Sequence, residues 1–87
     1  TTPQYRLESQ YNDLAFSSLQ GRIDFLLIQK GLEVTGTIDE DGQYVPSPKD
    51  DYLSHLIWNT VRAKGRVYIL DAEKMPQGMQ IAAVLRY

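Results

Sequence analysis

The residues best suited to acid–base chemistry stand close together, at Asp51, Ser54 and His55. His55 is the only histidine, and Asp51 precedes it by four residues, so on a helix the carboxylate could orient the imidazole. A Ser–His–Asp triad needs all three groups to converge at a pocket, but Ser54 and His55 would point about 100° apart on a helix. The spacing favours a surface histidine beside Asp51. A small enzyme with Asp51 and His55 in a dimer-interface cleft is an alternative.

An acidic segment that begins at Asp39 could suggest a calcium-binding loop. In EF-hand numbering, Asp39, Asp41 and Asp50 would take positions one, three and twelve. Tyr44 stands where that loop needs glycine, and two prolines stiffen its second half. We therefore interpret residues 39–42 as an acidic turn and predict no metal site.

A small basic cluster offers a different chemistry. Arg62, Lys64 and Arg66 lie near Trp58 in the sequence, and cations beside an aromatic ring are typical of nucleic-acid binding. The net charge of −2 opposes attraction to a nucleic-acid backbone. The same cations also complement the negative end of a helix dipole. Nucleic-acid binding through this patch is therefore an alternative interpretation.

The composition excludes several further classes of site. The chain has no cysteine, so it has no disulfide, thiolate metal site or cysteine nucleophile. Its glycines are isolated, so no phosphate-binding loop or dinucleotide fingerprint is present. No apolar run approaches the ~20 residues of a membrane span, and residues 1–4 lack the character of a signal peptide. We predict no cofactor, no catalytic residue set and no membrane association, and we expect a cytoplasmic protein.

The residue patterns predict the elements that would position these groups. At 87 residues the chain suits a single domain, 1–87. Alternation of apolar and polar residues predicts strands over residues 4–11, 32–38, 66–71 and 79–87, with a short strand at 43–45.

The clearest predicted helix covers residues 48–64. Ser47 suits its N-cap, Pro48 suits its first position and Gly65 would close it. Leu53, Leu56, Ile57, Thr60 and Val61 form its predicted inward stripe.

A second helix is predicted over residues 13–30, where Gly31 would end it in a Schellman motif. The run Phe25–Ile28 could instead be a strand. In that alternative, residues 22–38 form a hairpin and the protein has one helix.

Together these elements predict a two-layer α+β sandwich. We expect the ferredoxin-like order βαββαβ with an extra C-terminal strand, and two helices on one face of a mostly antiparallel sheet.

The last two strands are apolar on both faces, which is typical of strands covered on both sides. Val67 and Ile69 can face the helices. The opposite face would then carry Tyr68, Leu70, Ala82 and Val84. Two helices cover only one face, so we predict that a protein partner or a second copy of the chain covers this one. The preferred function is a small non-enzymatic cytosolic binding protein: a regulator, inhibitor or adaptor.

Overall fold

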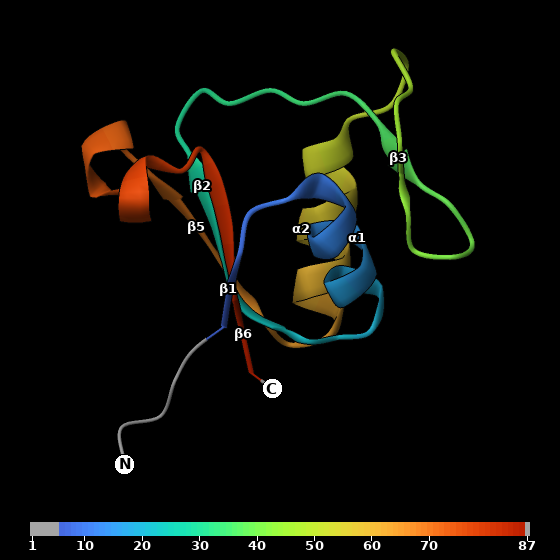
Figure 1. Ribbon diagram of the computed structural model, residues 1–87, viewed down its shortest axis with the longest axis horizontal. Helices are drawn as coiled ribbons and strands as arrows, with labels where there is room; N and C mark the ends of the chain where they lie inside the picture. The colour runs from blue at the N-terminus through green and yellow to red at the C-terminus, as the bar shows by residue number, and fades with distance from the viewer. Residues whose placement is uncertain (1–5, 87) are drawn as a thin grey trace.

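The computed structural model describes residues 6–86, and Figure 1 shows how their elements are arranged. The chain forms, in order, β1 (Arg6–Glu8), α1 (Tyr11–Leu19), β2 (Ile23–Gln29), β3 (Thr37–Ile38), β4 (Tyr44–Val45), α2 (Tyr52–Arg62), β5 (Arg66–Leu70), the 3-10 turns η1 (Ala72–Lys74) and η2 (Pro76–Gly78), and β6 (Ile81–Leu85).

The main sheet has four strands in the order β1-β6-β2-β5. β6 is antiparallel to both of its neighbours, whereas β2 and β5 are parallel. Both α-helices lie on one side of this sheet (Figure 1). The predicted α+β class, with two helices on one face of a mostly antiparallel sheet, is confirmed.

The strand order agrees with the prediction only in part. β3 and β4 pair with each other in a separate two-stranded sheet, so the strand predicted over residues 32–38 does not join the main sheet. In Figure 1 this hairpin lies beside the helices, away from the main sheet. The predicted strands at 43–45 and 66–71 are confirmed as β4 and β5. Residues 4–5 and 87 of the two outermost predicted strands lie outside the described part of the chain.

The helix predicted over residues 13–30 is wrong in its second half. α1 ends at Leu19, and Gly21 takes the left-handed conformation with φ of 68°. The N–H groups of Gly21 and Arg22 donate to the carbonyls of Ser18 and Ser17 at 3.2 and 3.0 Å, which is the Schellman pattern. The left-handed glycine that terminates the helix is therefore Gly21, ten residues before the predicted Gly31.

The alternative hairpin over residues 22–38 is also wrong, although it placed Phe25–Ile28 correctly in a strand. β2 pairs with β5 and β6, which come much later in the chain. β2 is a central strand with a neighbour on each edge. Apolar residues occupy both of its faces, so its sequence is a nearly continuous apolar run.

The helix predicted over residues 48–64 starts late. Its N-cap is Asp51, whose carboxylate accepts the N–H of Leu53 at 3.1 Å. The Tyr52 N–H donates to the carbonyl of Val34 at 2.9 Å, and Asp51 forms an antiparallel bridge with Thr35, so Asp51 is extended and the helix cannot begin before it. Lys64, with φ of 69°, supplies the left-handed residue that we expected from Gly65.

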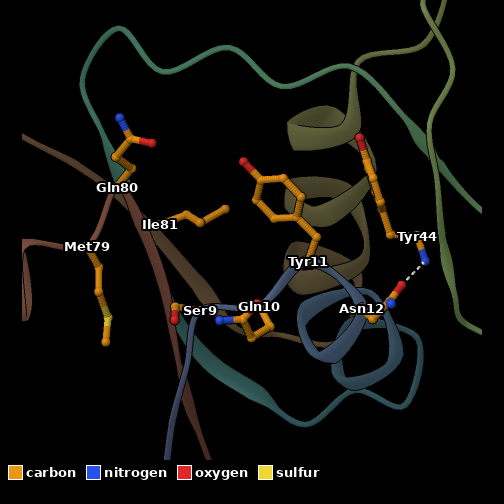
Figure 2. Close-up of a pocket in the computed structure, with 8 residues that line it drawn as sticks. All are labelled: Ser9, Gln10, Tyr11, Asn12, Tyr44, Met79, Gln80 and Ile81. Carbon is orange, nitrogen blue, oxygen red and sulfur yellow. Dashed lines mark hydrogen bonds between the residues drawn. The ribbon is translucent and has the colours of Figure 1, made fainter.

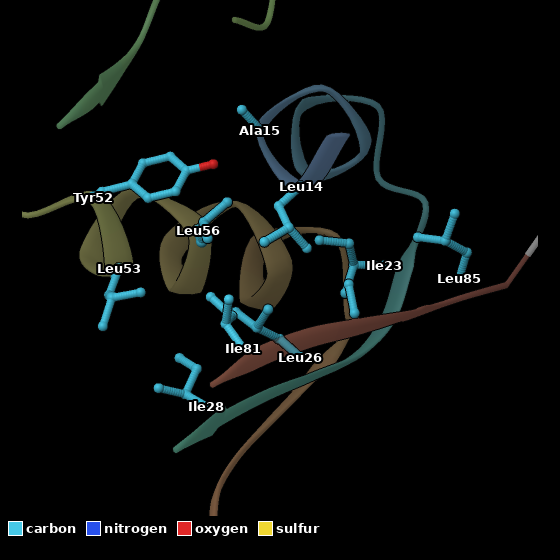
Figure 3. Close-up of a cluster of buried hydrophobic side chains, with 11 residues drawn as sticks. Leu14, Ala15, Ile23, Leu26, Ile28, Tyr52, Leu53, Leu56, Ile81 and Leu85 are labelled. Carbon is cyan, nitrogen blue, oxygen red and sulfur yellow. The ribbon is translucent and has the colours of Figure 1, made fainter. Parts of the chain in front are cut away.

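The core lies between the sheet and the helices (Figure 3). Leu26, Leu56 and Ile81 are buried there, as are Leu14 and Ile23. The predicted inward stripe of α2 is correct for Leu53, Leu56, Ile57 and Thr60, which are buried or half-buried. It is wrong for Val61, which is exposed.

Three tyrosines join the small hairpin to the helices. The rings of Tyr11, Tyr44 and Tyr52 have centroids 4.6–5.5 Å apart, and the buried Tyr52 hydroxyl donates to the carbonyl of Tyr11. Burial raises the pKa of Tyr52, with a smaller contribution from Tyr44 and Tyr11. Neither α-helix in residues 6–86 is long and apolar enough for a membrane span.

Candidate binding surfaces

The side of the main sheet that faces away from the helices carries an apolar surface, which we call the open face. Ladder register assigns its members: Phe25 and Leu7 each lie opposite Val84, and Leu27 lies between Ala82 and Tyr68. Leu70 follows Tyr68 by two residues and shares its side. The open face comprises Leu7, Phe25, Leu27, Tyr68, Leu70, Ala82 and Val84. The four residues predicted to share one face therefore do so.

Three of these residues were missed by the sequence analysis. Leu7 belonged to the first predicted strand, but its partner strand was unknown. Phe25 and Leu27 were assigned to a helix. The available signal was the run Ile23–Gln29 itself, whose length and aromatic and branched residues suit a buried strand.

The open face is tightly built at its centre and more accessible at its margin. Ala82 is fully buried, and most of its neighbours on the face are half-buried. Tyr68 is exposed, and its ring lies 6.0 Å from that of Phe25, centroid to centroid. The accessible surface of the open face is therefore provided by Tyr68 and the half-buried side chains, and the buried Ala82 does not contribute to it.

The connection between β5 and β6 lies at one end of the open face. Its two short turns, η1 and η2, project to the side of the sheet opposite the α-helices (Figure 1). Met75, which joins them, is buried. At the other end Arg66 lies opposite Phe25 in the ladder and is exposed, so it brings a positive charge to the apolar surface.

The predicted nucleic-acid patch is divided between two layers. Trp58 and Arg62 lie on α2, Lys64 lies in the following turn, and all are exposed. Arg66 shares the open face because the pleat of β5 places it on the same side as Tyr68. The Arg62 guanidinium donates to the Asn59 side chain at 3.3 Å. Arg66 is thus separated from the other members of the predicted patch, which lie on or just after α2.

Asp51 and Ser54, which were considered for acid–base catalysis, stabilise the first turn of α2. Besides capping the helix, the Asp51 carboxylate accepts the Ser54 hydroxyl at 2.7 Å. His55 is half-buried one turn into the helix. The acidic turn is likewise structural, because Asp39 accepts the N–H groups of Asp41 and Gln43 at 3.0 and 2.9 Å. Within residues 6–86, no three histidine or acidic side chains gather as a metal site would require.

A shallow pocket of about 440 Å³ lies where the β1–α1 turn meets the hairpin and the start of β6 (Figure 2). Asn12 fixes one wall by accepting the N–H of Tyr44 at 2.8 Å. Figure 2 shows the Tyr11 hydroxyl directed into the space between Gln80 and Tyr44. The lining residues are Ser9, Gln10, Tyr11, Asn12, Tyr44, Met79, Gln80 and Ile81. They offer hydrogen bonds and aromatic surface, and none of them is an aspartate, glutamate, histidine, lysine or arginine.

The sequence matches no known family model, and it has no significant similarity to the curated proteins.

Proposed function

We propose that this protein is a small, non-enzymatic, cytosolic binding protein that acts through protein–protein contacts on the open face. The observation that supports the proposal is the convergence of apolar side chains from all four strands of the main sheet on the side without α-helices. A cysteine-free chain suits the reducing cytosol.

The chemistry of the open face indicates the kind of partner. Aromatic residues give large contact areas at low cost in conformational entropy, which is why they anchor protein interfaces. Phe25 and Tyr68 supply such a pair on rigid neighbouring strands. Arg66 at the margin would favour a partner with an acidic group beside its own apolar surface.

Affinity capture from the native cell tests the proposal with a matched pair of substitutions. Val84→Asp places a carboxylate on the open face. Val45→Asp makes the same change at an exposed valine of the β3–β4 hairpin. We expect Val84→Asp to reduce recovery of the partner at least tenfold and Val45→Asp to leave it unchanged. Circular dichroism would establish that both variants are folded.

Equal recovery by wild type and folded Val84→Asp would contradict the proposal. The same holds if Val45→Asp caused the loss.

A further inference from the structure

β5 forms one end of the main sheet, and its outer edge is unpaired within residues 6–86. The carbonyl of Leu70 accepts the Lys30 N–H at 2.7 Å, so the backbone groups of Leu70 point toward β2. Successive residues of a strand direct these groups to opposite edges. Val67 and Ile69 therefore present their N–H and C=O groups to the free edge.

The helix layer beside this edge is apolar and exposed. The Asn59 side chain donates to Ser18 of α1 at 3.3 Å, which identifies the side of α2 that faces α1. Val61, two residues on, points about 200° away, toward the β5 side. Trp58, Ile69 and Val61 are 64%, 56% and 54% exposed, the highest values among the large apolar residues of the described chain.

β5 has few of the usual protections of a sheet edge. Its sequence, Arg-Val-Tyr-Ile-Leu, contains no proline or lysine, its only charged residue is Arg66 at its first position, and its register with β2 has no bulge. Natural edges without such features are templates for pairing with another strand.

The charges that flank β5 select both a partner and a direction. Lys64 and Arg66 lie at its beginning, and Asp71 and Glu73 follow its end, all of them exposed. Antiparallel pairing with an identical strand sets the basic end of one copy against the acidic end of the other. Parallel pairing would set like charges together, which is destabilising.

We propose that β5 pairs antiparallel with β5 of a second copy, about a two-fold axis at Tyr68, so that the two sheets become continuous. Val67 of each copy then lies opposite Ile69 of the other, and their edge-facing backbone groups can exchange hydrogen bonds. Asp71 of the second copy lies opposite Gly65, between Lys64 and Arg66. The contact covers the exposed residues beside the edge and sets the two Tyr68 side chains opposite each other, so that the open faces of the two copies become continuous. The inference does not depend on the proposed function, because the pairing needs no other protein.

The oligomeric state of the whole chain tests the pairing. Sedimentation at millimolar concentration should give a species of twice 10.0 kDa. Ile69→Lys puts a charge at the contact without removing a hydrogen bond to β2. Because each contact occurs twice in a two-fold dimer, Ile69→Lys should raise the dissociation constant of the dimer about tenfold or more. Val45→Lys, on the hairpin, should leave the dissociation constant unchanged.

Charge reversal keeps the proposal testable if one variant folds poorly. Arg66→Glu alone should weaken the dimer, and Arg66→Glu with Asp71→Lys should restore it. Hydrogen exchange gives a direct readout, because the amides of Val67 and Ile69 should exchange more slowly in the dimer than in the monomer.

Three results would overturn the pairing. The first is a wild-type protein that stays monomeric at millimolar concentration. The second is a dimer that Ile69→Lys leaves intact while Val84→Asp dissociates it, since this would place the contact on the open face. The third is exchange at Val67 and Ile69 that does not depend on protein concentration.

Discussion

Phe25 on β2 and Tyr68 on β5 lie with their ring centroids 6.0 Å apart, on the side of the sheet that carries no α-helix. The two residues are 43 positions apart in the chain, and the parallel pairing of their strands brings them together. This aromatic pair is the part of the open face best suited to anchor another protein.

Gly65 is required by a close approach of backbones. A Cβ at this position would lie 2.5 Å from the carbonyl oxygen of Ile23 and 2.7 Å from the Thr60 methyl group. Gly65→Ala should therefore lower the free energy of unfolding by about 2–3 kcal/mol. Gly31→Ala is the control: it has φ of +87° but no atom within 4 Å, so it should cost only about 1 kcal/mol. Urea denaturation compares the two, and equal losses would contradict the packing described for Gly65.

Lys64 occupies a left-handed conformation that favours glycine, with φ of 69°. Lys64→Gly should therefore raise the free energy of unfolding by about 0.5–1 kcal/mol, because it removes the strain of a side chain in this region. Lys49→Gly, at another exposed lysine, has no such strain to relieve and should not stabilise the protein. Thermal denaturation measures both. A lower melting temperature for Lys64→Gly would show that this side chain makes a stabilising contact.

Tyr52 makes the stability depend on alkaline pH. Its pKa is raised by burial, so the folded state favours the neutral phenol. A raised pKa contributes stability below the ordinary tyrosine value of about 10, and this contribution is lost as the pH rises above that value. The free energy of unfolding should thus fall more steeply above about pH 10 in wild type than in Tyr52→Phe. Identical slopes for the two proteins would contradict a buried neutral Tyr52.

The sequence was sufficient to predict the elements whose periodicity is unambiguous. α2, β5 and β6 were each expected near their observed positions, and alternation alone placed Tyr68 and Ala82 on one face. β2 was misassigned because Ile23, Leu26 and Leu27 also fall at helical spacing, so a central strand and an amphipathic helix share the same local pattern.

The remaining errors arise from contacts between distant segments. The late start of α2 depends on the Val34 carbonyl, which accepts the Tyr52 N–H. The separation of the β3–β4 hairpin depends on Tyr44 meeting the rings of Tyr11 and Tyr52. Neither contact can be inferred from local residue patterns. Phe25 was absent from the predicted face for the same reason, since its position follows from pairing with later strands.

The two phenylalanines of the chain allow the most direct test of the open face as a protein-binding surface. Phe25 lies on that face, whereas Phe16 is an exposed residue of α1 in the helix layer. A photo-crosslinking benzoylphenylalanine can replace either residue, and it makes the same enlargement of an aromatic side chain at both positions. In native cells we predict that position 25 forms a crosslink to a protein and that position 16 does not. Crosslinks from position 16 alone, or equal yields from both positions, would contradict the open face as the binding surface.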